Sequence, residues 1–285
     1  MSAITASVLS ASSAEPAVSD FPAAARLAAG GGFTADESEH FRREGYVVVR
    51  GLVDEALRGR MLASTHADLA AEVEPLEYEA DLHYPGAPPS RASQGGRTVR
   101  RLKQAHSRHI AFTDWLLDPP LVNRLRQIVG PDYFCPLAHH NCIMTKQPAH
   151  SSDTGWHQDI RYWSFERPDL VSVWLALTPE RPENGCLWLI PQTHRMEFSR
   201  DRLDADLFLR DDLPENQELI TRKIPAELEP GDVLFFHCRT FHAATRNHTA
   251  ATKYSVVFTF RPADNPPKPG TRSSESPELR IPTGM

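Results

Sequence analysis

The sequence lacks several features that would place it in a common class at once. No apolar run approaches the ~18–20 residues of a membrane-spanning helix, which excludes an integral membrane protein. Basic residues are not in excess: Lys and Arg number 31 against 37 Asp and Glu, giving a net charge of −6. Nucleic-acid binding depends on a basic surface, so a general nucleic-acid binder is disfavoured.

Cysteine is scarce, and none of the four cysteines belongs to a CxxC pair: they are Cys135, Cys142, Cys186 and Cys238. A zinc ribbon or a thioredoxin-type site is therefore not expected. The N-terminus also lacks the basic segment and apolar stretch of a secretory signal. Reduced, partly buried thiols in a cytoplasmic protein fit these observations.

Glycine is also less frequent than proline, with 15 residues against 24, which favours many short elements joined by rigid turns. Residues 1–30 are rich in Ala and Ser and are predicted to form a disordered tail. One domain is expected over residues 31–264. The remaining residues, 265–285, are predicted to be an extended or flexible C-terminal tail.

The first half of the domain contains helix signals. Thr34 and Glu37 have the spacing of a capping box, and a buried strand follows at residues 46–49. Further helices are expected near 54–72 and at 119–129. Residues 75–99, between these two helices, are rich in Pro and Gly. Connections of this length usually have a function, so a lid or binding loop is predicted.

The second half has a different pattern, in which short apolar runs alternate with turn signals. The predicted strands are 133–146, 170–178, 186–190, 232–237 and 253–261. Strands at such spacing indicate a sandwich or a barrel.

One short motif suggests chemistry. His157 and Asp159 flank Gln158, and His242 follows the apolar strand 233–236. In an extended segment residues i and i+2 point to the same side, so one strand can supply two adjacent metal ligands. Two histidines and one carboxylate on one face of a metal are typical of non-haem Fe(II) oxygenases. With 13 histidines and 37 acidic residues, however, the motif alone can also be a chance surface pair.

Larger blocks support the oxygenase interpretation. The segments HQD, NGCL, IPxTH, PGDVLFFH and HxxxxN occur in this order. Over residues 34–262 the sequence resembles the phytanoyl-CoA dioxygenase-like branch of the Fe(II)/2-oxoglutarate-dependent oxygenases. The resemblance implies a mainly β fold with flanking α-helices: a double-stranded β-helix, the jelly-roll or cupin-like barrel, buttressed by N-terminal helices. It also implies Fe(II), 2-oxoglutarate and O2 as cofactor and co-substrates, and a small-molecule substrate.

The resemblance assigns roles to particular residues. His157, Asp159 and His242 match the iron ligands of the family. Lys253 stands where the family usually has an arginine that binds the distal carboxylate of 2-oxoglutarate; a lysine offers a point charge instead of a planar fork. Ala244 replaces a small hydroxyl residue that often binds the co-substrate.

Other positions carry a weaker resemblance. The residues matched to the co-substrate pocket are Trp174, Gln158, Lys103 and Cys142. Barrel core, a solvated basic face and a packed thiol are the respective alternatives for Trp174, Lys103 and Cys142. The candidate substrate contacts, together with the 75–99 segment, are Arg161, Tyr162, Trp163 and Arg246. His237 and His248 are predicted not to be ligands, and His139, His140, His150 and His194 are predicted to be structural or solvent-facing.

The predicted activity is hydroxylation, or another oxidation, of an unactivated C–H bond of a small molecule, with release of succinate and CO2. Alternatives are a cupin-like binding protein with a vestigial metal site, a halogenase, or another metal enzyme on the same barrel. Halogenases of this superfamily lack the carboxylate ligand, so Asp159 favours oxidation. A monomer or a homodimer is expected, without a membrane or nucleic-acid partner.

Overall fold

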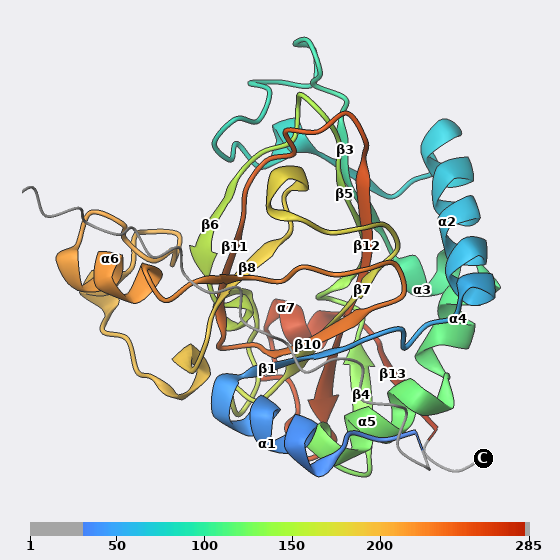
Figure 1. Cartoon of the computed structure of the whole chain (residues 1–285), viewed down its shortest axis with the longest axis vertical. Helices are drawn as coiled ribbons and strands as arrows, with labels where there is room; N and C mark the ends of the chain where they lie inside the picture. Colours follow the sequence, from blue (N-terminus) through green and yellow to red (C-terminus); the bar gives the residue numbers. More distant parts are fainter. Residues whose placement is uncertain (1–30, 283–285) are drawn as a thin grey trace, which may run out of the picture.

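The computed structural model describes residues 31–282 (Figure 1). The N-terminal segment predicted to be disordered, residues 1–30, lies outside the described residues. Within them, no helix is long and apolar enough to cross a lipid bilayer.

The α-helices lie mainly in the first half of the chain: α1 (Ala35–Glu44), α2 (Glu55–Ala70), α3 (Ala105–Arg108), α4 (Ile110–Leu116), α5 (Pro119–Val129), α6 (Pro214–Ile220) and α7 (Arg272–Glu275). Short 3-10 helices are η1 (Glu79–Asp81), η2 (Asp159–Tyr162), η3 (Pro182–Asn184), η4 (Thr193–Arg195) and η5 (Arg200–Arg202). The helix predicted at 119–129 is confirmed with the same bounds.

The predicted capping box also forms at the start of α1. The Glu37 amide donates to the Thr34 hydroxyl at 3.1 Å, and the Thr34 amide donates to the Glu37 carboxylate at 2.7 Å. Gly45 ends the helix at φ +82°, and a Cβ there would lie 2.4 Å from Nδ1 of His194. The conformation and the space at this turn both require glycine.

The larger sheet contains nine strands among the described residues: β1 (Tyr46–Val49), β2 (Leu76–Tyr78), β3 (Val99–Lys103), β4 (Tyr133–Pro136), β5 (Asn141–Lys146), β7 (Val171–Ala176), β10 (Val233–His237), β12 (Lys253–Pro262) and β13 (Glu278–Arg280). The main order is β1-β10-β7-β12-β5-β3-β2, and β4 joins β12 to β13. The pairings between its strands are antiparallel.

The smaller sheet contains β6 (Thr154–His157), β8 (Leu187–Ile190), β9 (Ile224–Pro225) and β11 (Phe241–Ala244), in the order β6-β11-β8-β9. In Figure 1 this sheet lies on one side of the larger sheet, and helices α2 and α4 lie on the other. Strand β6 is an edge strand.

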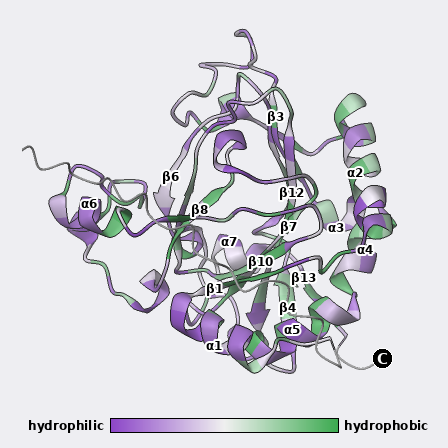
Figure 2. Ribbon diagram, viewed as in Figure 1, coloured by the Kyte–Doolittle hydropathy of each residue, from purple (hydrophilic) through white to green (hydrophobic). Residues whose placement is uncertain are grey.

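Alternation along β7 explains the layers. Val173 and Leu175 belong to the core cluster that contains Phe112 and Trp115 of α4. Trp174 and Ala176 belong to a second cluster that contains residues of β8 and β11. Because successive strand residues point to opposite faces, one strand supplies both cores. In Figure 2 the inner strand β8 is hydrophobic, whereas α1, on the outside, is largely hydrophilic.

The segment from residue 265, predicted to be an extended or flexible tail, contains α7 and β13. Leu279 of β13 pairs with Cys135 of β4. The charged segment 195–222 contains α6, from which Leu219 packs into a small cluster with Phe241 of β11.

Candidate metal centre

Two neighbouring strands of the smaller sheet place the predicted metal ligands together. His157 of β6 and His242 of β11 are direct partners in the antiparallel register. Asp159 begins η2 two residues after His157. One ligand atom from each side chain lies within 4.8 Å of those from the other two, and all three residues are buried. This spacing is close to that of ligands around a single ion.

Backbone carbonyls orient both imidazoles. Nδ1 of His157 donates to the Gly155 carbonyl at 2.8 Å, and Nδ1 of His242 donates to the Thr240 carbonyl at 3.0 Å. This arrangement leaves both Nε2 lone pairs available to a metal. Burial holds the pKa of His157 well below its usual value, so its imidazole is neutral, as a metal ligand must be.

The Asp159 carboxylate is only half satisfied by the protein. Oδ2 accepts a hydrogen bond from the Ser172 hydroxyl at 2.8 Å. Oδ1 is buried without a hydrogen-bond partner and lies 3.5 Å from Nε2 of both His140 and His242. Burial acts to raise the pKa of Asp159, but the adjacent histidines, His140 first, lower it, so the carboxylate is ionised. A buried anionic oxygen without a donor is costly, and a cation there would satisfy it.

A small cavity of about 50 Å³ extends from the two histidines into the space between the sheets. Its lining includes Ala244, and the cationic side chains that reach it are Arg100, Arg101, Lys146 and Lys253. The predicted co-substrate residues Lys253 and Trp174 both lie here, beside His157 and His242.

The Lys253 ammonium already has an anionic partner. Its Nζ lies 3.0 Å from Oε2 of Glu180, and both side chains are almost fully buried. Glu180 also accepts hydrogen bonds from the Trp174 indole at 2.7 Å and from the Ser255 hydroxyl at 2.6 Å. The ammonium lies 5.1 Å from the Trp174 ring centroid. Glu180 was missed in the sequence, because no motif relates it to a strand that starts more than seventy residues later.

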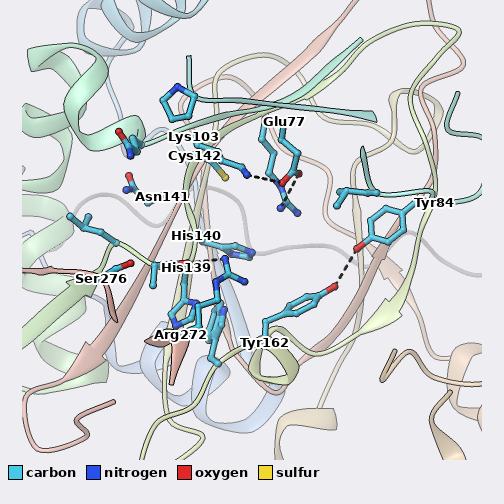
Figure 3. A pocket seen from close by; sticks show the side chains of 17 residues that line it. Glu77, Tyr84, Lys103, His139, His140, Asn141, Cys142, Tyr162, Arg272 and Ser276 are labelled. Atoms are coloured by element: carbon cyan, nitrogen blue, oxygen red, sulfur yellow. Dashed lines mark hydrogen bonds and ion pairs between the residues drawn. The ribbon is translucent and has the colours of Figure 1, made fainter. Parts of the chain in front are cut away.

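A second, larger cavity of about 440 Å³ lies on the other side of His140 (Figure 3). His140 and Arg101 line both cavities. In the view of Figure 3, Tyr84 and Tyr162 point toward each other at one edge of the lining, with their hydroxyls 3.2 Å apart. The lining also includes Trp163 and several residues of the segment 75–99, in the region predicted to be a lid or binding loop.

Three residues predicted to contact the co-substrate do not line the cavity beside the histidines. Lys103 lies in the larger cavity, half exposed, 3.3 Å from the Glu77 carboxylate. Cys142 also lines that cavity, with its thiol 3.7 Å from the sulfur of Met144. Gln158 points away from the metal centre, because its amide donates to the Arg239 carbonyl.

The four predicted substrate contacts separate into two groups. Tyr162 and Trp163 line the larger cavity, whereas Arg161 and Arg246 do not. Arg161 stacks on Phe208, with its guanidinium carbon 3.6 Å from the ring centroid. Arg246 forms an ion pair with Asp153 at 2.6 Å.

His140 is a neighbour of the metal centre that no motif in the sequence revealed. It was predicted to be structural or solvent-facing, but it lies beside Asp159 and packs edge-on against Trp163, with ring centroids 5.4 Å apart. Burial lowers its pKa, which favours the neutral imidazole. No spacing in the sequence relates His140 to the HxD motif, so only the fold reveals this contact.

Comparison with known proteins agrees with the fold and identifies the family. The sequence model of the family described as phytanoyl-CoA dioxygenase (PhyH) matches residues 41–255. A probable phytanoyl-CoA dioxygenase of Caenorhabditis elegans is 20% identical over 230 residues, covering 78% of this chain and 73% of the relative. An ectoine dioxygenase of Streptomyces avermitilis is 24% identical over 251 residues, covering 82% and 81%.

Among solved structures, EctD from S. alaskensis with 2-oxoglutarate and 5-hydroxyectoine superposes with a TM-score of 0.71 at 17% identity. The match covers 91% of this chain and 89% of EctD. This similarity confirms the predicted jelly-roll fold with flanking helices. As its motifs predicted, the chain belongs to the phytanoyl-CoA dioxygenase family of Fe(II)- and 2-oxoglutarate-dependent oxygenases.

Proposed function

We propose that His157, Asp159 and His242 hold Fe(II), and that the chain uses 2-oxoglutarate and O2 to hydroxylate a C–H bond of a small molecule in the larger cavity. The single observation that carries this proposal is the Asp159 oxygen Oδ1, which is buried, ionised and without a donor, 3.5 Å from the His242 Nε2. Three protein ligands on one side leave other positions of the metal open for small ligands.

Iron and 2-oxoglutarate would supply the oxidising chemistry when bound, and the protein's contribution is positioning and protection. Backbone carbonyls fix the imidazole orientations, and Ser172 holds the second oxygen of Asp159. Such outer contacts keep ligands in place before the metal arrives. His140 and Arg101 lie between the two cavities, where substrate and metal centre would meet.

The lining of the larger cavity indicates the kind of substrate. It carries three cations, Arg101, Lys103 and Arg272, and one carboxylate, Glu77, together with the rings of Tyr84, Tyr162 and Trp163. Glu77 pairs with Arg101 at 3.1 Å and with Lys103 at 3.3 Å, which leaves a net positive lining. We infer a small substrate with an anionic group and an apolar or planar body.

The test is a turnover assay with the purified full chain, Fe(II) and 2-oxoglutarate. A panel of small carboxylates, phosphates and neutral analogues is offered, and O2 consumption and succinate release are measured together. Anionic, ring-bearing members should stimulate succinate release, and one oxygen atom should appear in the product. Asp159→Ala should abolish the signal, whereas Asp211→Ala, at an exposed carboxylate, should not.

Two results would redirect the proposal. The chain could consume no 2-oxoglutarate in an iron-dependent way, either with any member of the panel or without substrate. That result would favour the binding protein with a vestigial metal site. Efficient chlorination in the presence of chloride would favour the halogenase, although Asp159 occupies the position that a halide would need.

A further inference from the structure

The C-terminal segment, residues 263–282, forms part of the wall of the larger cavity. Arg272 of α7 and Ser276, which directly follows this helix, are among the residues that line the cavity. The family sequence model matches residues 41–255, so the whole segment lies outside the matched part of the chain. Side chains in this segment are therefore free to differ with the substrate, while the matched part carries what the family shares.

Buried polar contacts fix this segment to the neighbouring chain. The buried Asn265 side chain accepts a hydrogen bond from the Arg167 amide at 2.7 Å and donates one to the Arg167 carbonyl at 2.9 Å. The hydroxyl of Ser273, also buried, accepts from the Ser164 amide at 2.9 Å. Beyond α7, β13 pairs with β4. A segment held in this way presents its exposed side chains from a fixed base, as binding loops on a rigid scaffold do.

The same segment supports an aromatic part of the cavity wall. The Ser273 hydroxyl is hydrogen-bonded to Nε2 of His139 at 2.9 Å. The His139 ring packs on Trp163, with ring centroids 5.1 Å apart, and both of these residues line the cavity. Helix α7 thus contributes a cation to the cavity through Arg272 and, through Ser273 and His139, supports a ring of the same lining.

Arg272 differs from the other cations of this lining in having no anionic partner. Arg101 and Lys103 share the Glu77 carboxylate, at 3.1 and 3.3 Å. In the part of the chain that the structure describes, no carboxylate lies within 4.0 Å of the Arg272 guanidinium, which donates to the Ala138 carbonyl at 3.1 Å. In the view of Figure 3, Arg272 lies apart from Glu77 and Lys103. Its charge is therefore available to an oxyanion in the cavity.

We propose that Arg272 binds an oxyanion of the substrate, a carboxylate or a phosphate, and so selects acids over neutral molecules of the same shape. The inference rests on the proposed function, because it concerns the cavity in which the substrate would bind. A guanidinium stays charged and offers oxyanions a planar fork of donors, which suits recognition of one end of a molecule. Arg272 is a specificity-determining residue in this assignment, and the C-terminal segment is the part of the chain that positions it.

The test compares acids with neutral molecules of matched shape. Phenylacetate, 3-phenylpropanoate and phenyl phosphate are titrated by calorimetry into the anaerobic full chain with Fe(II) and 2-oxoglutarate present. The two carboxylates are repeated as their amides, phenylacetamide and 3-phenylpropanamide. Wild type, Arg272→Gln, Arg272→Lys and Arg280→Gln are compared. Arg280 lies on β13 of the same segment, is exposed and does not line the cavity, so it serves as the control arginine.

We expect wild type to bind the acids more tightly than the amides. Arg272→Gln should raise the Kd of the acids about 10-fold, the lower end of the range for charge-assisted hydrogen bonds, because Arg272 is exposed. The Kd of the amides should change by less than about twofold, since they carry no charge. Arg272→Lys should retain most of the preference for acids, and Arg280→Gln should match wild type. The acid with the larger loss, carboxylate or phosphate, identifies the oxyanion that the site takes.

Other outcomes overturn the assignment. Acids bound by Arg272→Gln as tightly as by wild type would exclude Arg272 from the site, and equal weakening of acids and amides would show a structural effect instead. Equal affinity of wild type for acids and amides would exclude selection of an anion. If Arg272→Gln does not fold, Arg272→Met is judged by the same criteria. Absence of succinate release with every acid would count against the proposed function, even where binding depends on Arg272. Turnover of an acid with the same KM in wild type and Arg272→Gln would overturn this inference alone.

Discussion

The two ends of the buried cavity are built in opposite ways. At the metal end, the ionised Asp159 carboxylate has one buried oxygen that lacks a hydrogen-bond donor. At the far end, Lys146 is a positive charge without a carboxylate partner. A cation at the first end and an anion at the second would each compensate one of these charges.

The strongest test of the metal end is removal of its ligands. His157→Ala, Asp159→Ala and His242→Ala should each lower iron-dependent turnover at least about 10³-fold, or roughly 4 kcal/mol in the barrier, since an open three-ligand site tolerates no loss. Iron content and succinate release are measured on folded protein. Near wild-type turnover in any iron-loaded single variant would contradict the assignment of that residue.

At the lysine end of the cavity, Glu180→Gln tests whether the ion pair between Lys253 and Glu180 stabilises the fold. The amide keeps an acceptor for Trp174 and Ser255 but leaves a second uncompensated ammonium. Removing one partner of a buried ion pair typically destabilises a protein by about 3–5 kcal/mol. Urea unfolding without added ligand gives the free energy of unfolding.

The matched control is the double variant Glu180→Gln/Lys253→Met, which removes both charges. It should recover most of the lost free energy of unfolding, because no charge is then left unpaired. A single variant as stable as wild type would show that Glu180 does not compensate Lys253.

Ser172→Ala sharpens the metal end without removing a ligand. The hydroxyl holds Oδ2 of Asp159, and loss of such a contact commonly weakens metal affinity about 10- to 100-fold. We expect the lower part of that range, measured by competition with a chelator. Because Ser172 acts through Asp159, the Kd for Fe(II) should rise while the KM for 2-oxoglutarate at saturating iron stays near wild type. A raised KM for 2-oxoglutarate with an unchanged Kd for Fe(II) would contradict a positioning role for Ser172.

The remaining prediction is a pH dependence at the lysine end. Lys146 has a pKa of about 7 in the folded chain, against an ordinary value of 10.5. Burial lowers this pKa most, followed by Arg100 and Lys253, whereas Glu79 and Asp153 act to raise it. Between these values the unfolded chain binds more protons than the folded one. The free energy of unfolding contributed by Lys146 therefore rises with pH across this window, by at most about 1.4 kcal/mol per pH unit.

Urea unfolding of wild type and Lys146→Met at pH 7, 8 and 9 isolates this contribution, because other titrating groups are common to both. The stability difference should shift in favour of wild type as the pH rises. Parallel curves for the two proteins would show that Lys146 titrates normally.

Features set by local sequence were predictable. The Thr34–Glu37 capping box, the helix 119–129 and the HxD spacing depend on residues within one or two turns of chain, and the structure has all three. The family motifs added His242, which lies far along the chain, and the barrel that brings it to His157.

Features set by long-range register were not predictable. Strand β6 has the sequence Thr-Gly-Trp-His, which carries no strand period, and it forms because β11 offers a ladder. The partners of Lys253 and Asp159 also depend on long-range register. The turns that bring Glu180 to Lys253 and His140 to Asp159 carry no local sequence signal. Lys146 ends the predicted strand 133–146, but its lack of a carboxylate partner is visible only when the surrounding strands are in place.

The direct opposition of His157 and His242 has a mechanical consequence. β6 is an edge strand, and its last residue, His157, would share an ion with His242 of β11. Such an ion would act as a removable cross-link between segments roughly 85 residues apart. Closing a loop of that length in the unfolded chain costs entropy. Ligand linkage then makes the melting temperature of the chain depend on free Fe(II). Amide hydrogens of β6 would exchange faster than those of β12 once a chelator withdraws the ion, and the edge of the smaller sheet would report metal loss before the rest of the barrel responds.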